Sequence, residues 1–451
     1  MLRENTDIIK KTLERSKKDK VAFIDLQFTD FLGNIKSSTI PIYNFEDALK
    51  RGIWFDGSSI EGYARIHESD MYLMPDPLTY ALLPWRNNVE IGRVARAICD
   101  VYKPNHEPFE GDPRNILKRT LGEAKLLGFE YFTGPECEFF LFKKDDEGRI
   151  ISKSRGNGFY FNLIMDEAYR IKREIMEALY EMGIKSETST HEVAEGQHEI
   201  DIRYDNALRT ADNTITLKMA TKFIAFKHNF HATFMPKPFF GINGSGMHTH
   251  QSLWKRGRNS FYDNGDKYGL SSIAYHFLTG QLKNVREIVG VLAPNINSYK
   301  RLTPGYEAPV YACWARINRS ALIRVPQVSK GYEDKATRIE IRCPDPSGNP
   351  YLVFAVLLKA GLEGIKKKLK APNPVEENLF EFNDEKLAKH YIVKLPASLD
   401  EAINEIETGK LVKQTLGEYT WRRYIEAKKE EWDNFRISVT DWELNRYLVN
   451  T

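Results

Sequence analysis

The segment Gly134-Pro135-Glu136-Cys137-Glu138-Phe139-Phe140 predicts a strand that carries two carboxylates among apolar neighbours. Residues two positions apart on a strand point to the same face, so we expect Glu136 and Glu138 to lie side by side. Two like charges at that separation repel each other unless a cation lies between them. The pair therefore indicates either a metal site or an exposed strand edge, and these residues alone leave both interpretations open.

Two later segments supply further side chains that could bind a metal, carboxylates in one and imidazoles in the other. Glu192 and Glu199 flank Gly196, and a glycine at that place predicts a bend or hairpin across which the two carboxylates could face each other. His248 and His250 follow a glycine-rich loop and share one face of the next predicted strand. A lone histidine is more often structural, but the glycines before this pair let the backbone approach a ligand closely.

The segment 338–342, Arg-Ile-Glu-Ile-Arg, alternates strictly and places Arg338, Glu340 and Arg342 on one strand face. One interpretation is a surface strand whose ladder of ion pairs adds little stability. The other is a carboxylate ligand between two guanidiniums that bind anions. More arginines lie between residues 301 and 324, and we interpret the whole group as a site for an anionic substrate.

Together these segments offer five glutamates and one histidine as metal ligands. An oxygen-rich site with one imidazole suits Mg²⁺ or Mn²⁺. Two such ions would offset most of the negative charge, and two metals among arginines suit phosphoryl transfer. The chain has neither the GxxxxGK[ST] nor the GxGxxG pattern, so a nucleotide would bind without either common phosphate loop.

The composition is that of an ordinary globular protein of 451 residues, with 42% hydrophobic and 28% charged residues. A formal net charge of +3 gives no reason to expect a nucleic acid or a membrane as partner. The four cysteines form no CxxC pair and are typical of a reducing compartment. The N-terminus has no apolar signal segment, and no apolar run approaches the roughly 20 residues of a membrane helix, so we expect a cytoplasmic protein.

The pattern along the chain predicts an α+β protein. Strands are expected at 21–26 and 91–101, and the segment 103–108, which contains two prolines, marks a domain boundary. Asp112 is expected to cap a helix over 113–127. Residues 297–309 predict a loop that could act as a lid. Further helices are expected at about 167–182, 207–229, 350–369 and 400–436.

These segments resemble type I glutamine synthetase. FDGSSIEG, PECEFF, HEVAEGQHE, NGSGMHTHQS, NSYKRLTPGYEAP, NRSALIR and RIEIR occur in family order between residues 55 and 342. The resemblance covers nearly the whole chain and implies a small β-grasp domain at 16–104. A catalytic domain at 108–451 would follow, with a curved antiparallel sheet and flanking helices. It further implies a homo-dodecamer of two stacked hexameric rings, in which one subunit completes the active site of its neighbour.

The resemblance implies ATP-dependent ligation of ammonia to the γ-carboxylate of L-glutamate, through γ-glutamyl phosphate, giving L-glutamine, ADP and phosphate. Two or three Mg²⁺ or Mn²⁺ ions would act in each active site. A sibling ligase that joins glutamate to a larger amine is the nearest alternative, although such relatives tend to alter the DGSS loop, which is intact here. A catalytically silent ring protein would require damaged ligands, and all six metal positions are intact.

The resemblance also assigns roles to single residues. One metal would be held by Glu138, Glu192 and Glu199, and the other by Glu136, His248 and Glu340. Glutamate would bind Arg301, Arg342 and the Asn243-Gly244 backbone, with Arg319 and Arg324 around the transferred phosphate. His250, Ser252, Lys335 and Arg338 would contact the nucleotide. Asp56 and Ser59 of a neighbouring subunit would form the ammonium site with Tyr160, and Glu307 would be the flap glutamate.

Two departures indicate the branch of the family. Phe380 stands where the branch regulated by adenylylation has a tyrosine, so we expect no adenylylation. The HEVAEGQHE segment has the shorter length typical of the branch of Gram-positive bacteria and archaea. In that branch an arginine after the DGSS loop takes part in feedback control by glutamine, and Arg65 is the matching candidate, with an ordinary surface or interface arginine as the alternative. Small regulatory proteins are candidate partners.

Overall fold

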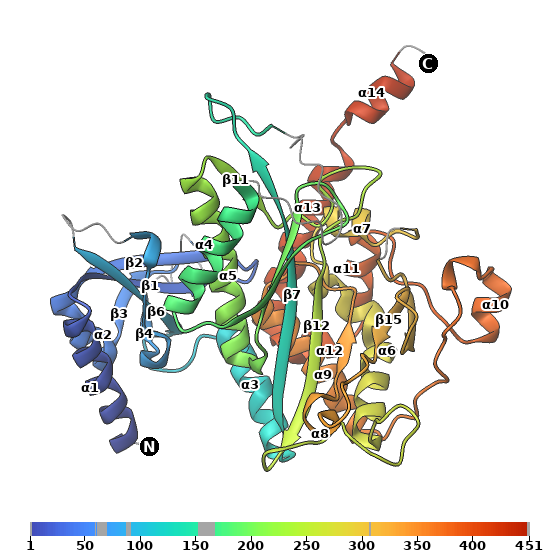
Figure 1. The fold of residues 1–451 in the computed structure, drawn as a ribbon, viewed down its shortest axis with the longest axis horizontal. Coiled ribbons are helices and arrows are strands. Elements are labelled where there is room, and N and C mark those ends of the chain that lie inside the picture. The colour runs from blue at the N-terminus through green and yellow to red at the C-terminus, as the bar shows by residue number, and fades with distance from the viewer. Residues whose placement is uncertain are drawn as a thin grey trace.

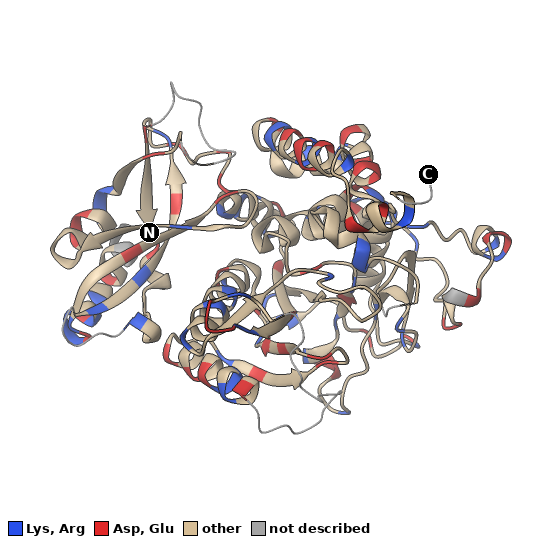
Figure 2. Ribbon diagram, turned by 90° about the horizontal axis from the view of Figure 1, so that it is seen from above, with Lys and Arg blue, Asp and Glu red and all other residues tan. Residues whose placement is uncertain are grey.

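The computed structural model describes residues 2–58, 60, 70–86, 92–151, 167–305 and 308–448. A small N-terminal unit lies beside a much larger unit that carries the long central strands (Figure 1). Charged residues of both signs are interspersed over both units in the view of Figure 2. Within the described parts of the chain, none of the helices combines the length and the apolar character that crossing a membrane requires.

The N-terminal unit is a six-stranded sheet in the order β2-β1-β6-β4-β3, with β5 paired to β6. The expected strands at 21–26 and 91–101 are confirmed as β1 and β6, which pair in parallel. Its core is apolar and is formed by residues such as Ile24, Leu26 and Leu73. The elements are α1 (Leu2–Lys18), β1 (Val21–Thr29), β2 (Ile35–Pro41), η1 (Ile42–Asn44), α2 (Phe45–Arg51), β3 (Ile53–Asp56), β4 (Asp70–Pro75), η3 (Pro77–Thr79), β5 (Ala81–Leu82), η4 (Pro84–Arg86) and β6 (Arg93–Tyr102).

The larger unit is built on a ten-stranded sheet in the order β14-β15-β16-β12-β7-β9-β8, with β10 and β11 paired to β7 and β13 to β12. Every pair is antiparallel except β14–β15. The strands are β7 (Glu130–Lys143), β8 (Ser186–His191), β9 (Gln197–Ile202), β10 (Asp205–Asn206), β11 (Phe230–Thr233), β12 (Met247–Lys255), β13 (Arg258–Asn259), β14 (Tyr311–Ala315), β15 (Ala321–Arg324) and β16 (Ile339–Ile341).

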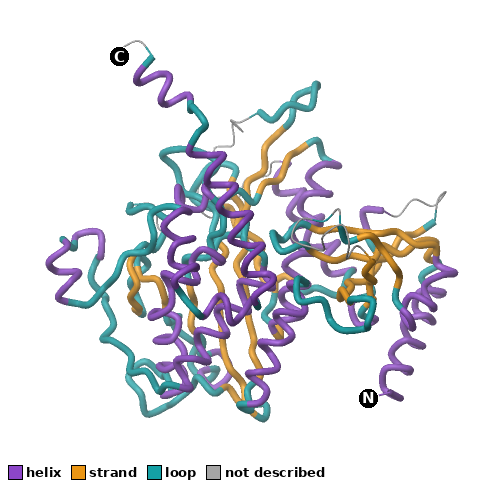
Figure 3. Tube along the Cα trace, turned by 180° about the vertical axis from the view of Figure 1, so that it is seen from behind, coloured by secondary structure: helices purple, strands orange, loops and turns teal. Residues whose placement is uncertain are grey.

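Helices cover one face of this sheet (Figure 3). The helices of the larger unit, of which α10 and α14 project away from the sheet (Figure 1), are α3 (Pro113–Leu126), α4 (Glu167–Glu181), α5 (Ala207–Lys227), α6 (Ser272–Leu292), α7 (Ile296–Arg301), α8 (Glu333–Ala336), α9 (Pro350–Lys366), η5 (Leu379–Glu381), α10 (Asp384–Lys389), α11 (Leu399–Thr408), α12 (Leu411–Leu416), α13 (Glu418–Arg436) and α14 (Asp441–Tyr447). The cap predicted for α3 is confirmed, because the Asp112 carboxylate accepts a hydrogen bond from the Arg114 amide at 3.0 Å.

Two expectations about helices were wrong, and one long helix was missed. The segment 400–436 is three helices, because Gly409 and Gly417 end α11 and α12. Residues 297–301 are not part of a loop but form most of α7, which Asn295 caps with its side chain. The long helix α6 was not expected, and it packs against α9 through glycines: a Cβ atom on Gly364 would lie 2.0 Å from the carbonyl oxygen of His276.

A buried ion network joins the two units. The Arg114 guanidinium on α3 donates to Asp100 of β6 at 2.7 Å and to Asp76 after β4 at 2.7 Å. It also donates to both carboxylate oxygens of Asp212 on α5 at 3.0 Å. Arg114 is 2% exposed. The N-terminal sheet is therefore tied to the helical layer of the larger unit by one cation and three carboxylates.

The strand β7 has two different faces, and this difference positions the site. Cys137 and Phe139 point into the main core against the helices. Glu136 and Glu138 alternate with them and point to the opposite face of the sheet, where cavities open. The predicted alternation of carboxylates and apolar residues is therefore present in the structure.

Candidate active site

Strand register brings the predicted carboxylates and histidines of β7, β9 and β12 together on the open face of the sheet. Glu138 on β7 pairs with Glu199 on β9. Glu136 lies between Asp201 on β9 and His248 on β12. Residues far apart in the sequence thus become neighbours across the three strands β9, β7 and β12.

A first cavity of about 330 Å³ lies over these strands, and we call it the carboxylate cavity. Twelve of the predicted site residues line it. They are Glu136, Glu138, Glu192, Glu199, Asn243, Gly244, His248, Arg301, Arg319, Arg324, Glu340 and Arg342.

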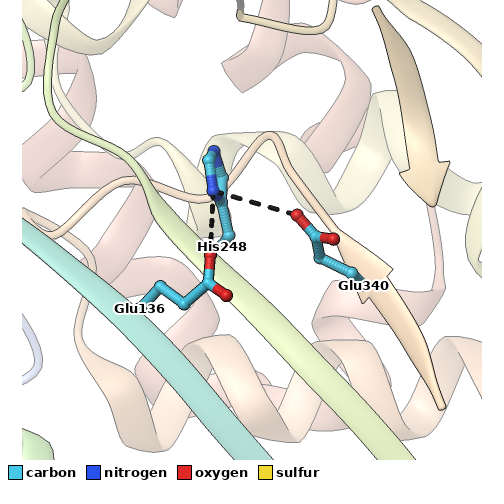
Figure 4. Close-up of side chains that lie close together, drawn as sticks. All are labelled: Glu136, His248 and Glu340. Atoms are coloured by element: carbon cyan, nitrogen blue, oxygen red, sulfur yellow. Dashed lines mark hydrogen bonds and ion pairs between the residues drawn. The ribbon is translucent and has the colours of Figure 1, made fainter. Parts of the chain in front are cut away.

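Glu136, His248 and Glu340 bring ligand atoms within 4.8 Å of one another (Figure 4). His248 Nδ1 lies 3.3 Å from Glu136 Oε2 and 3.9 Å from Glu340 Oε1. Burial and the nearby Arg342 lower the pKa of His248, so that a neutral ring with a free lone pair faces two carboxylates. Such a set fits a divalent cation with mixed oxygen and nitrogen ligands.

Glu340 is 1% exposed and is held on both sides by arginines. Arg324 Nη1 donates to Glu340 Oε2 at 2.9 Å, and Arg342 Nη1 donates to Glu340 Oε1 at 2.7 Å. A surface ladder of ion pairs is therefore excluded for the segment 338–342. The two arginines orient this carboxylate and also line the cavity themselves.

A second group of carboxylates, Glu138, Glu192 and Glu199, crowds the other end of the cavity. Burial and the neighbouring Glu192 raise the pKa of Glu138 to about 8. Burial, Asp201 and Glu138 raise the pKa of Glu199 to about 11. Glu138 is 7% exposed in a central strand, so the exposed-edge interpretation is excluded. Carboxylates packed this closely repel one another, and a cation between them would relieve that repulsion.

Glu136 is also part of the wall of a second cavity of about 280 Å³, which we call the adjoining cavity. It is lined by His250, Ser252, Lys335 and Arg338, the four residues that the resemblance groups together. Arg338 Nε donates to His250 Nδ1 at 3.1 Å, so the proton of that ring is on Nε2, which donates to Glu136 Oε1 at 2.7 Å.

The guanidinium of Arg301 is buried at the edge of the carboxylate cavity. It donates to the carbonyl oxygens of Arg342 and Cys343 at 3.1 and 3.0 Å. The loop that contains Asn243 and Gly244 lies against it, because a Cβ atom on Gly244 would lie 3.3 Å from the Arg301 side chain. The Arg301 guanidinium and the backbone of Gly244 thus both border the carboxylate cavity.

Asp56 lies apart from both cavities of its own chain. It ends β3 in the N-terminal unit and is exposed. The hydroxyl and amide of Ser58 donate to its carboxylate at 2.6 and 2.8 Å, and these bonds lower its pKa. The other predicted residues, Ser59, Arg65, Tyr160 and Glu307, lie outside the described residues.

The structure adds residues that the sequence argument missed. Gln197 lines the carboxylate cavity, and its position inside the HEVAEGQHE segment was the only signal. Asp201 and Tyr204 line the adjoining cavity. There the Tyr204 and Phe132 rings pack edge to face, with 6.3 Å between the ring centroids. Asp201 follows Glu199 by two residues, so the strand alternation that pairs Glu136 with Glu138 could have identified it.

Two adjoining cavities, one crowded with carboxylates and arginines and one with an aromatic wall and basic side chains, suit a reaction between two anionic substrates held by cations. The cations would neutralise the carboxylates, and the arginines would hold or neutralise negative groups of the substrates.

Comparisons with known proteins agree over both units. The family model "Glutamine synthetase, beta-Grasp domain" matches residues 20–104, and "Glutamine synthetase, catalytic domain" matches residues 110–447. Glutamine synthetase of Clostridium saccharobutylicum is 51% identical over 96% of this chain and 96% of its own length. That of Methanosarcina mazei is 50% identical over 97% and 96%. The cryo-EM structure of Plasmodium falciparum glutamine synthetase has a TM-score of 0.86 with 26% identity, over 98% of each chain.

Proposed function

The chain belongs to the glutamine synthetase family and catalyses the ATP-dependent synthesis of glutamine from glutamate and ammonia, and we propose that its two cavities divide this reaction between them. Glutamate binds in the carboxylate cavity and ATP in the adjoining cavity. The observation that carries this assignment is the position of Glu136, which belongs to the wall of both cavities. The γ-phosphate of ATP and the γ-carboxylate of glutamate would meet beside it.

ATP is needed because a carboxylate is a poor acyl donor, since its leaving group would be oxide. Attack of a γ-carboxylate oxygen on the γ-phosphorus breaks the bond to ADP and gives γ-glutamyl phosphate. Ammonia then attacks the acyl carbon, a C–N bond forms, the C–O bond to phosphate breaks, and the nitrogen loses one proton to give the neutral amide. The departing phosphate is a good leaving group, so glutamine forms under mild conditions.

The family uses Mg²⁺ or Mn²⁺, which when bound neutralises charge on the transferred phosphoryl group. We assign one ion to Glu136, His248 and Glu340. A second ion would be held by the carboxylates at the other end of the cavity, which are Glu138, Glu192 and Glu199. The crowding of carboxylates and the neutral His248 ring support both assignments.

Basic residues complete the binding of both substrates. We propose that Arg301, Arg342 and the Asn243-Gly244 backbone hold the glutamate carboxylate and ammonium groups. Arg319 and Arg324 neutralise the phosphoryl group as it moves. In the adjoining cavity the basic side chains Lys335 and Arg338, with His250 and Ser252, bind the nucleotide, and the Phe132 and Tyr204 rings offer an apolar wall to its base.

We propose that Asp56 acts in the cavity of a neighbouring subunit. Ammonium is no nucleophile until it loses a proton, and an ionised carboxylate can accept that proton. The hydrogen bonds from Ser58 keep Asp56 ionised, and its exposure on the N-terminal unit leaves it available to a second copy. Ser59 of the same segment and Tyr160 would complete the ammonium site. Glu307 would close the site and exclude water from γ-glutamyl phosphate.

A shared site requires an assembly, and we propose a homo-dodecamer of two stacked hexameric rings. The domains of each subunit would be 16–104 and 108–451, and Arg65 would take part in feedback control by glutamine.

Analytical ultracentrifugation measures the size of the assembly. Mixing inactive Asp56→Asn chains with inactive Arg319→Ala chains should restore part of the activity, because some sites then receive both intact residues. No restoration after proven subunit exchange would contradict a shared site.

The reaction is tested by phosphate release from ATP with Mg²⁺, leaving out glutamate and ammonium in turn. We expect release that needs both substrates, with one glutamine formed for each phosphate. Release with a larger amine but little with ammonium would instead identify a sibling ligase. If no phosphate is released under any condition while the assembly is intact, the chain is a ring protein without catalytic activity.

A further inference from the structure

Gln197 is the first residue of β9 and is 2% exposed, although its side chain ends in the carboxylate cavity. Its amide nitrogen Nε2 donates to Glu138 Oε2 at 2.8 Å and to the carbonyl oxygen of Gly244 at 3.1 Å. One amide group therefore connects a carboxylate of β7 with the glycine loop on the other side of the cavity.

The backbone of Gln197 makes a second set of connections. Its carbonyl oxygen accepts a hydrogen bond from the Glu192 amide at 2.9 Å, and its own amide donates to the Ala194 carbonyl at 3.0 Å. These two bonds close the turn between β8 and β9. Glu192, which the turn carries, is thereby placed opposite Glu138.

The orientation of Glu138 follows from the same contacts. Gly246 donates its amide to Glu138 Oε2 at 2.9 Å, on the oxygen that Gln197 also contacts. Both hydrogen bonds that the described residues make to this carboxylate end on Oε2, so Oε1 is left for a cation. Groups that hold a metal ligand in this way typically change metal affinity by about 10- to 100-fold when they are removed.

We propose that Gln197 is a positioning residue that couples cation binding at Glu138 and Glu192 to glutamate binding at Gly244. The inference rests on the proposed function of the carboxylate cavity. A cation that fixes Glu138 also fixes the amide of Gln197, and the amide fixes the Gly244 carbonyl beside Arg301. Coupling of two binding events is reciprocal, so glutamate must tighten cation binding by the same factor.

The test measures Mn²⁺ binding to the full chain by the electron paramagnetic resonance signal of free Mn²⁺, with and without L-glutamate and without ATP. In the unaltered chain, glutamate should lower the dissociation constant of one Mn²⁺ per chain. Gln197→Met keeps the length of the side chain and removes the amide. We expect this variant to bind that ion at least about 10-fold more weakly and to lose the effect of glutamate.

Two further variants keep the test independent of folding. Gln197→Glu keeps the shape but replaces the donor by an acceptor, so it should also lose the effect of glutamate. Gln281→Met is the matched control, because Gln281 is a buried amide on α6 that donates to Gln251 and to Leu357 and lines neither cavity. It should keep the effect of glutamate.

Steady-state rates add a second measurement. In Gln197→Met the KM for glutamate should rise at fixed Mn²⁺ while the KM for ATP stays unchanged. An unaltered chain that makes no glutamine would refute the proposed function. An active chain whose Mn²⁺ affinity does not respond to glutamate, or a Gln197→Met variant that behaves as Gln281→Met does, would refute the coupling alone.

Discussion

Replacing Arg114 by methionine removes the cation that joins the two units and leaves three carboxylates behind. At an effective dielectric constant of about 20, two unit charges about 4 Å apart attract each other by about 4 kcal/mol. Arg114 is in contact with Asp76, Asp100 and Asp212, and burying its guanidinium offsets much of that attraction. Removing one partner of a buried ion pair typically costs about 3–5 kcal/mol, and we expect a loss of that size near neutral pH.

The loss should depend on pH with a definite sign. Burial raises the pKa of Asp100, but Arg114 and Lys118 outweigh burial and hold it below its ordinary value. In the unaltered chain this carboxylate therefore stabilises the fold above its unfolded pKa, and that contribution is lost as pH falls. Without Arg114 we expect burial to dominate and raise the pKa, so that ionisation then opposes folding. The deficit of Arg114→Met should shrink between about pH 7.5 and about pH 5.

Urea unfolding at one fixed subunit concentration measures this difference at both pH values. Lys118→Met is the matched control, because it removes the partly exposed second cation of Asp100 and should cost less than about 1 kcal/mol. Adding Asp212→Asn to Arg114→Met should recover about 1–3 kcal/mol, since a buried unpaired charge disappears. A variant as stable as the unaltered chain near neutral pH, or an equal deficit at both pH values, would refute the reasoning.

Other predictions concern packing, thiols and modification. Gly364→Ala should destabilise the chain by about 3 kcal/mol or more, because its Cβ would lie 2.0 Å from the His276 carbonyl oxygen. The Cβ of Gly122→Ala meets nothing within 4 Å, so this variant should raise the free energy of unfolding by about 0.5–1 kcal/mol. Urea unfolding of both variants measures the two changes. All four cysteines are buried, and burial raises their pKa values, so a thiol reagent near pH 8 should label none in the folded chain and all four in urea; fast labelling of the folded chain would contradict this. Mass spectrometry of chain purified from nitrogen-rich cells should find no AMP on Phe380 or its neighbours, since phenylalanine has no hydroxyl to carry it.

The site was accessible from the sequence where it follows strand alternation. Glu136 and Glu138 share a face because the side-chain pattern of a strand repeats every two residues. Predicting this required no knowledge of distant contacts. The cap of α3 was equally local, since Asp112 and Pro113 are adjacent in the chain. Local rules therefore predicted the carboxylates on β7 and the start of α3.

The parts that could not be predicted depend on tertiary contacts. The short helix α7 is held by partners far along the chain, because Glu431 accepts a hydrogen bond from the Ile296 amide and Asn297 pairs with the Lys237 backbone. The role of Gln197 depends on Gly244, which lies in another loop. The packing of whole elements decides such neighbours, and a single sequence contains no direct signal of it.

The two faces of β7 also limit how this gene can change in length. A one-residue insertion or deletion between 134 and 140 would exchange Glu136 and Glu138 with Cys137 and Phe139, placing carboxylates in the core and apolar groups in the cavity. A library of single-residue insertions and deletions should therefore be empty at this strand among functional clones, while the exposed turn at 145–149 should accept many.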